Sequence, residues 1–346
     1  MKYSDIMRHG AITAAVAFAS FAAKAVENLS TPQIHGVLRT RFEATTEEPV
    51  EYRFQVRYAR LTLGGDIGSS IKYFVQTDLC DQGKMKILDV WSRINITRAL
   101  YFQAGQFRMP FGVETFQAPS NYVFVNRSYM GKQMCNYRAV GAKLAYTFQY
   151  APLLVEAGAF NPRAIGDHNV WQNRFAASGK ATWSPGSLIF SAGMASIVPD
   201  SVRANLFDAS AGFHKGRWQT RAEYMFEHYT GKAHPDSHAW TLWADYRFPV
   251  KAGIFNTMSV QGRYDGITNH ASLAANPVSL PGEPLRLDTT TPTRNRITAG
   301  VTMTAFVSST LSADVHANYE YIMYHSGQSG NRGEQSKAVV ELVLRF

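Results

Sequence analysis

Many segments of this sequence alternate apolar and polar residues over about ten positions. Between Leu311 and Tyr321 the odd-numbered positions hold only Leu, Ala, Val and Tyr, whereas the even-numbered positions hold Ser, Asp, His, Asn and Glu. The same alternation runs through 296–305 and 217–227, where Met225 is an apolar exception on the polar face. Successive side chains of a β-strand point to opposite faces, so each segment predicts a strand with one apolar and one polar face.

The spacing of these segments decides between two all-β architectures. A soluble sandwich would also alternate, but many strands of about ten residues favour a transmembrane β-barrel. The predicted strands, sixteen by our count of the sequence, are 33–42, 54–64, 70–79, 87–95, 100–107, 139–149, 153–160, 175–184, 187–196, 205–213, 217–229, 238–248, 257–265, 296–306, 309–323 and 336–346. The connections 43–53 and 80–86 are of middling length, which leaves the count open by two.

The connections themselves alternate in length. Every second one is a tight turn, such as Ser184-Pro185-Gly186, whereas most of the others are longer, with 108–138 and 266–295 the longest. This alternation is typical of a barrel with one rim in the periplasm and the other outside the cell. A barrel of sixteen strands has a lumen too wide for wall side chains to fill, so we expect a water channel.

Both ends of the chain agree with an outer-membrane protein. Residues 1–25 read as a signal peptide: Lys2 and Arg8 precede a short apolar run, and Ala23-Lys24-Ala25 is a cleavage site. An N-terminal anchor helix is the alternative, but the run is shorter than the ~20 residues that a membrane helix needs. The last strand stops on Phe346, and this ending resembles the assembly signal of outer-membrane barrels, although an edge strand of a sandwich would also fit.

Positive charge is concentrated in the first third of the chain. The whole sequence carries a net charge of +9, and residues 33–143 hold 15 Lys or Arg against 9 Asp or Glu, a net of +6. The loop 108–138 alone has four cations against one acid. A basic loop that narrows a channel attracts anions and raises their local concentration, so we expect small anions as the partner. Nucleic acid is not expected as a partner of an outer-membrane barrel.

Several motifs resemble the phosphate-selective porin family of the O and P type. They are Gly105-Gln106-Phe107-Arg108-Met109-Pro110-Phe111-Gly112 followed by Glu114 and Asn126-Arg127-Ser128, the strand Arg57-Tyr58-Ala59-Arg60-Leu61, the pair Leu88-Asp89, and Gln219-Thr220-Arg221-Ala222-Glu223-Tyr224. Asn126 stands where the family usually has an acid, and Tyr58 where a second Arg often stands. The resemblance covers about 33–346 and implies a trimeric porin of sixteen strands, with the loop after the fifth strand folded inward and arginines lining the pore.

Strand parity and the basic charge of the loop 108–138 select the candidate site residues, and the resemblance agrees in implying arginines that line the pore. The expected anion-binding or pore-lining residues are Arg39, Arg41, Arg60, Asp89, Arg108, Arg127, Lys132 and Arg138. Arginine suits phosphate because its planar fork donates two parallel hydrogen bonds. Asp89 is expected to point into the lumen, on the face of its strand opposite to Leu88, where it would orient a neighbouring arginine. The alternative is that these charges lie on solvated loops or bind the phosphates of lipopolysaccharide.

Two strand arginines cannot both point inward from a regular strand. Arg57 and Arg60 differ in parity, so either a β-bulge intervenes or Arg57 belongs to the rim. We favour Arg60 in the lumen.

The loop 108–138 is too long and apolar to stand in water, and we expect it to fold into the lumen with Arg127 near the narrowest point. Cys80 and Cys135 either form a disulfide between the wall and this loop or are two unrelated buried thiols.

These observations favour an outer-membrane porin for small anions, phosphate among them, in a Gram-negative cell. A general or differently selective solute channel is the main alternative, and a barrel hydrolase or an adhesion protein is a weaker one. The ten His form no Cys/His ligand cluster, and no phosphate-binding glycine loop or convincing nucleophile elbow is present. We therefore expect no enzyme activity, no metal and no cofactor. Outer-membrane lipid, lipopolysaccharide and two further copies of the chain are the expected macromolecular partners.

Overall fold

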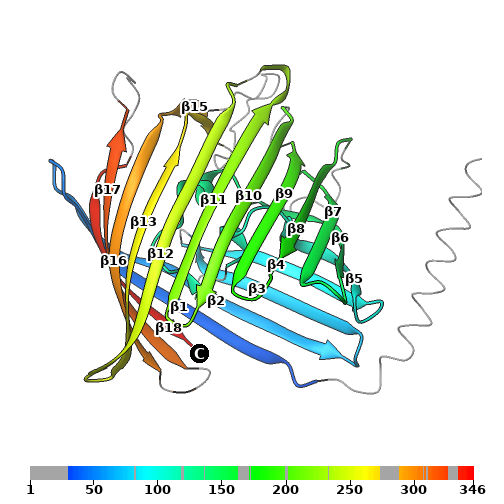
Figure 1. Ribbon diagram of the computed structural model, residues 1–346, viewed down its shortest axis with the longest axis horizontal. Helices are drawn as coiled ribbons and strands as arrows, with labels where there is room; N and C mark the ends of the chain where they lie inside the picture. The colour runs from blue at the N-terminus through cyan, green and yellow to red at the C-terminus, as the bar shows by residue number, and fades with distance from the viewer. Residues whose placement is uncertain are drawn as a thin grey trace, which may run out of the picture.

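The strands of this protein close into one antiparallel barrel (Figure 1). The computed structural model describes residues 30–81, 83–117, 121–135, 137–162, 171, 173–198, 202–232, 234–272, 288–306, 308, 311–325 and 334–346. The predicted signal peptide lies outside these residues. Within the described ranges, no helix is long and apolar enough to span a membrane.

The barrel has sixteen strands among the described residues, as the sequence predicted. They are β1 (Gln33–Thr45), β2 (Tyr52–Ile67), β3 (Ile71–Asp81), β4 (Lys84–Asn95), β5 (Leu100–Arg108), β6 (Arg138–Thr147), β7 (Leu153–Phe160), β8 (Ala176–Trp183), β9 (Leu188–Ile197), β10 (Ala204–Lys215), β11 (Trp218–Tyr229), β12 (Ser237–Ala252), β13 (Phe255–Ile267), β16 (Arg294–Phe306), β17 (Ser312–Tyr324) and β18 (Lys337–Arg345). The strands β14 (His270–Ser272) and β15 (Asp288–Thr291) form a separate two-stranded sheet in the connection from β13 to β16.

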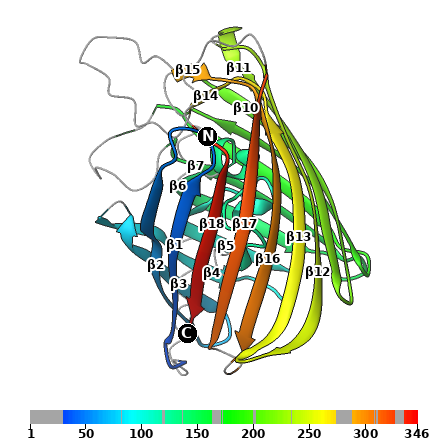
Figure 2. The ribbon, with the colours of Figure 1, turned by 90° about the vertical axis from the view of Figure 1, so that its left-hand side faces the viewer.

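Each barrel strand pairs with its neighbours in the chain, and β1 pairs with β18 to close the wall. Figure 2 shows this seam, with the carboxyl terminus at the rim where the short turns gather and β14 and β15 near the opposite rim. The β3–β4 connection is an exception at the long-loop rim, because both strands extend into the segment 80–86 that was expected to be a loop. The extra ladder pair Asp81↔Lys84 lies in this hairpin.

The barrel is polar inside and apolar outside, the reverse of a soluble protein. On β17 the side chains of Asp314, His316 and Glu320 are buried, whereas Tyr319 and Tyr321 are exposed on the outer face. Lipid takes up the apolar outer face, and the backbone groups are satisfied within the closed ladder. The alternation in the sequence therefore predicted correctly which side chains of β17 face the lumen.

Two β-bulges on the wall change the parity of the strands that carry them. In the β1–β2 ladder Arg39 pairs with Tyr58 and Thr40 with Val56, so Arg57 is the extra residue. This confirms the bulge alternative, because Arg57 and Arg60 both line the lumen.

The second bulge corrects one expectation. In the β3–β4 ladder Gln76 pairs with Asp89 and Thr77 with Ile87, which leaves Leu88 as the extra residue. Leu88 was expected on the outer face, but it is buried and lines a cavity of the lumen. Gln106 Nε2 donates a hydrogen bond to the Leu88 carbonyl at 2.8 Å. The Gln of the Gly-Gln-Phe motif thus satisfies a backbone group at the bulge.

Candidate channel constriction

The loop after β5 enters the lumen and first contacts the wall at β8, β10 and β11. The Gly112 N–H donates to Asp208 Oδ1 at 3.1 Å, and the Val113 N–H donates to Glu223 Oε1 at 2.8 Å. Lys180 Nζ donates to the Gly112 carbonyl at 2.5 Å. Gly112 has φ +71°, a left-handed conformation that glycine adopts without strain. Buried carboxylates of the wall thus hold the start of the loop by its backbone.

The middle of the loop is fixed to the wall near the seam of the barrel. The Val125 N–H donates to Asn318 Oδ1 at 2.7 Å, and its carbonyl accepts from Arg39 Nη2 at 3.0 Å. The Tyr129 N–H donates to Asp265 Oδ2 at 2.8 Å. These contacts join the loop to β1, β13 and β17, so the inward folding of the loop is confirmed. Figure 1 shows this segment within the barrel.

A short helix, α2 (Tyr129–Gln133), closes the loop over an apolar core. The Ser128 side chain caps the helix by accepting from the Gly131 N–H, and Glu114 accepts from the Ser128 N–H at 2.9 Å. The loop side chains in the core are Met109, Phe111, Tyr129, Met130, Met134 and Cys135. They pack against wall residues such as Phe160, Leu206, Met225 and Ile267. The apolar residues of the loop therefore fill one side of the lumen and leave the other side open.

The open side is a basic cavity of about 1430 Å³ between the loop and the wall around β1, β2, β4 and β18. Its cationic lining residues are Arg41, Arg53, Arg57, Arg60, Lys84, Lys86, Arg127, Lys132, Arg138, Arg296 and Lys337. Its acidic lining residues are Glu43, Glu51, Asp78 and Glu334. Eleven cations against four acids give this surface a net charge of +7. Such a surface raises the local concentration of anions at the channel mouth.

Five of the eight predicted site residues line this cavity. They are Arg41, Arg60, Arg127, Lys132 and Arg138. The other three lie behind the lining: Arg39 is 1% exposed and pairs with Glu341, and Asp89 accepts from Arg138 Nε and Nη2 at 3.0 and 3.1 Å. Arg108 is buried, with Nη1 3.5 Å from the Gln117 carbonyl that accepts its hydrogen bond. Anion binding by any of these residues remains a prediction.

Two tyrosines that sequence reasoning did not select organise the arginines. The guanidinium carbons of Arg60, Arg57 and Arg39 lie 4.0, 4.8 and 5.5 Å from the centroid of the Tyr58 ring. Arg39 also lies 5.3 Å from the centroid of the Tyr122 ring. A ring face attracts a guanidinium without neutralising its charge. The Tyr at position 58 therefore attracts the neighbouring arginines without cancelling their positive charge, whereas a carboxylate would cancel it.

Arg127 connects these tyrosines to the loop. Its guanidinium carbon lies 5.6 Å from the centroid of the Tyr122 ring, and its Nη1 donates to the Gly131 carbonyl at 3.2 Å. Burial opposes its charge, but Tyr122, Tyr58 and Glu114 outweigh burial and raise the pKa of the guanidinium above its ordinary value. Arg127 is therefore a permanent cation of the cavity surface.

The described segment just before β18 also reaches the constriction. Lys132 Nζ of α2 lies 3.1 Å from Glu334 Oε1, and Arg294 Nε lies 3.6 Å from Glu334 Oε2. Burial opposes ionisation of this carboxyl, but Lys132 and the arginines Arg294 and Arg296 lower its pKa to about 2. Glu334 thus stays ionised over the physiological range and ties the segment before β18 to the constriction helix.

Several lining cations escaped selection from the sequence. Arg296 and Lys337 lie on the polar faces of β16 and β18, so alternation indicated an inward direction for both. Their approach to the loop depends on the register in which the strands of the closed wall pair, and the sequence does not reveal this register. Lys84 and Lys86 lie in the part of β4 that was expected to be a loop.

The two cysteines are not joined by a disulfide. Cys135 is buried beside Gly112, where an added Cβ would lie 3.1 Å from its Sγ. Burial raises the pKa of the Cys135 thiol well above its ordinary value. Cys80 Sγ lies 3.8 Å from the Val56 carbonyl, on the strand wall. The wall and the loop are therefore held together by hydrogen bonds and packing.

Comparison with known proteins agrees with these observations. A family model described as phosphate-selective porin O and P matches residues 39–188, which confirms the resemblance over that part of the chain. A search of curated protein sequences found no match.

Three solved structures share the fold. The in-vitro folded trimer form of OmpT from Vibrio cholerae is 14% identical, with a TM-score of 0.57 and coverage of 91% of this chain and 98% of that one. Salmonella typhi OmpF in complex with daunomycin is 13% identical, with a TM-score of 0.60 and coverage of 91% and 97%. The outer membrane channel DcaP of Acinetobacter baumannii is 11% identical, with a TM-score of 0.60 and coverage of 91% and 97%. The fold is that of outer-membrane porins, and these findings support a porin channel.

Proposed function

We propose that this chain, which carries the sequence signature of the phosphate-selective porins O and P, forms a water-filled outer-membrane channel that prefers small anions. The observation that carries the proposal is the charge of the open cavity, with eleven Lys or Arg against four Asp or Glu. Field lines concentrate in a narrow polar lumen with low-dielectric walls, so a net positive lining admits anions and repels cations.

Phosphate is a suitable solute for the arginines of this cavity. Arg57 and Arg60 both contact the Tyr58 ring, and Arg127 lies on the loop that faces them. Each guanidinium can donate two parallel hydrogen bonds to phosphate oxygens. We propose Arg41, Arg60, Arg127, Lys132 and Arg138 as the anion-contacting residues of the predicted set. Arg39, Asp89 and Arg108 would support them from behind.

We further propose that the mature protein begins after residue 25, acts in the outer membrane of a Gram-negative cell and assembles as a homotrimer. The OmpT structure of similar fold is a trimer form, which supports this assembly. Lipopolysaccharide would contact the outer rim. The proposed activity is diffusion through a channel, with no catalytic step.

A general or differently selective channel is the second candidate, and one observation favours it. Several lining cations are paired with acids: Arg60 Nε lies 3.0 Å from Asp78 Oδ2, and Arg41 Nη2 lies 3.1 Å from Glu43 Oε1. Paired charges attract permeating anions less than unpaired ones.

Single-channel recording on the purified protein separates the two candidates. In a KCl gradient, an anion-preferring channel gives a reversal potential toward that of chloride, and inorganic phosphate should reduce the chloride current if it binds in the cavity. A reversal potential toward that of potassium would contradict the proposal. A chloride preference without block by phosphate would indicate a general anion channel that does not bind phosphate in the cavity.

A further inference from the structure

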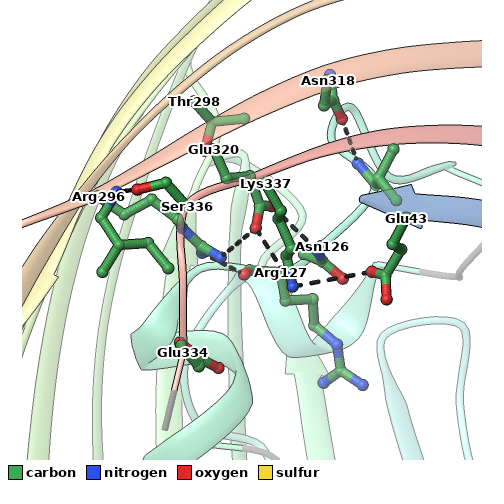
Figure 3. Close-up of polar contacts among 12 residues, drawn as sticks. Glu43, Asn126, Arg127, Arg296, Thr298, Asn318, Glu320, Glu334, Ser336 and Lys337 are labelled. Atoms are coloured by element: carbon green, nitrogen blue, oxygen red, sulfur yellow. Dashed lines mark hydrogen bonds and ion pairs between the residues drawn. The ribbon is translucent and has the colours of Figure 1, made fainter. Parts of the chain in front are cut away.

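The side chain of Asn126 connects the constriction loop to two oppositely charged groups of the wall. Its Oδ1 accepts from Arg41 Nη1 at 2.8 Å, and its Nδ2 donates to Glu320 Oε1 at 3.0 Å. Figure 3 shows Asn126 next to Arg127, with Glu320, Arg296 and Lys337 of the wall around them. An amide has both a donor and an acceptor, so it can bridge a cation and an anion while remaining neutral itself.

The wall around this amide has an excess of one positive charge. Arg41 Nη2 lies 3.1 Å from Glu43 Oε1, and Lys337 Nζ lies 3.8 Å from both Glu43 Oε1 and Glu320 Oε2. Arg296 Nη1 lies 3.3 Å from Glu320 Oε2. Arg53 also pairs with Glu43, and Arg296 continues the network through Asp265, Arg263 and Glu114. The whole network holds five cations and four carboxylates, a net of +1, and Arg41, Arg296 and Lys337 line the open cavity.

We infer that the neutral amide of Asn126 preserves the anion selectivity of this wall, because it bridges Arg41 and Glu320 without cancelling the excess positive charge. This inference rests on the proposed anion channel. A carboxylate at position 126 would accept the same hydrogen bond from Arg41. It would also cancel the excess charge and place an acceptor against the Glu320 carboxyl group, to which the amide donates a hydrogen bond.

The position of the loop does not depend on this side chain alone. The Asn126 carbonyl accepts from Arg263 Nη1 at 2.8 Å, and the neighbouring Val125 is bonded to the wall through both its N–H and its carbonyl. A substitution of the Asn126 side chain therefore leaves the loop attached. This separation allows the charge at position 126 to be tested apart from the fold.

The test is the chloride-to-potassium permeability ratio of three variants in a KCl gradient at pH 7. Asn126→Asp should lower the ratio about threefold, because one added negative charge attracts potassium and repels chloride at the same point. Asn126→Ala, which removes the amide but adds no charge, should keep the ratio close to that of the wild type. Asn256→Asp adds the same charge at an exposed position on the short-turn rim and should also leave the ratio nearly unchanged.

A fourth variant has the opposite expected sign. Glu43→Gln removes the carboxylate that pairs with Arg41 and should raise the ratio about threefold, so the inference stays testable even if Asn126→Asp does not fold. An unchanged ratio in Asn126→Asp or in Glu43→Gln would overturn the inference. So would an Asn126→Ala ratio as low as that of Asn126→Asp, since the side chain would then act through geometry rather than charge. Potassium preference in the wild type would instead contradict the channel proposal itself.

Discussion

The phenyl ring of Phe346 lies directly over Gly36 at the seam of the barrel. The Gly36 N–H donates to the Phe346 carbonyl at 2.6 Å, and the Phe346 N–H donates to the Gly36 carbonyl at 3.1 Å. A Cβ on Gly36 would lie 2.2 Å from the nearest atom of the ring. The last residue of the chain therefore fits β1 only where β1 carries no side chain.

Substitution at this contact should weaken the closure of the barrel. We expect Gly36→Ala to reduce the free energy of unfolding by about 1–2 kcal/mol, because the ring must move aside. Urea unfolding followed by circular dichroism measures the change. Gly262→Ala is the matched control, since an added Cβ there meets no atom within 4 Å. Gly36→Ala should reduce the free energy of unfolding less in a protein that also carries Phe346→Ala than in the wild type. An equal reduction in the two proteins would contradict the proposed contact.

Gly105 of the Gly-Gln-Phe motif should be less tolerant than Gly36. It has φ +132°, and a Cβ there would lie 2.2 Å from the Val90 carbonyl oxygen, which belongs to the backbone of β4 and cannot turn away. Gly105→Ala should therefore cost more than about 3 kcal/mol or prevent folding. Gly179→Ala, with its nearest neighbour 3.5 Å away, is the control. Wild-type stability in Gly105→Ala would show that β4 and β5 are not in this close register.

Replacement of Arg127 should change selectivity without unfolding the barrel. Arg127→Ala removes a half-buried guanidinium of the cavity lining, and we expect the chloride-to-potassium permeability ratio to fall several-fold. The loop should stay in place because Arg296 Nη2 donates to the Arg127 carbonyl at 2.7 Å and not to its side chain. Arg127→Lys should retain most of the preference, since it keeps the charge. Equal permeability ratios in the wild type and in Arg127→Ala would show that Arg127 does not contribute to selectivity.

Acid should loosen the contact between the segment just before β18 and the constriction helix. The pKa of Glu334 is lowered to about 2 from an ordinary 4.5, so the ionised carboxylate stabilises the folded state above about pH 4.5. This contribution is lost as the pH falls from 4.5 toward 2. Glu334→Gln should show a smaller loss of stability over that range than the wild type. Lys132→Ala should show a similarly small loss of stability over that range, because the Lys132 ammonium is the nearest partner of the Glu334 carboxylate.

The thiols offer a direct check of the loop path. Denatured, unreduced protein should label at both of its cysteines, because the structure contains no disulfide between Cys80 and Cys135. In the folded protein Cys135 should react far more slowly than in the denatured protein, since it is buried and its pKa is raised. Rapid labelling of Cys135 in the folded state would mean that the loop leaves the wall.

The alternation in the sequence is enough to predict the barrel and the faces of its strands. A period of two residues assigned Asp314, His316 and Glu320 to the lumen, because lipid excludes their charges and hydrogen bonds from the outer face. The parity conflict between Arg57 and Arg60 left two alternatives, a bulge or Arg57 at the rim, and the β1–β2 ladder contains the bulge. The apolar residues of the loop indicated that it must pack inside. Each of these inferences uses only neighbours in the chain.

Which charges meet depends on how the whole chain folds. Asn126 is 85 residues from Arg41 and 194 residues from Glu320, and the three come together because β18 closes on β1 and the loop crosses the lumen between them. Asp89 and Leu88 were assigned by a regular period that the β4 bulge interrupts. Parity gives the face of a residue, but the height and angle at which it meets the loop depend on the register of the whole closed wall. Those contacts decide which arginines line the cavity and which lie behind it.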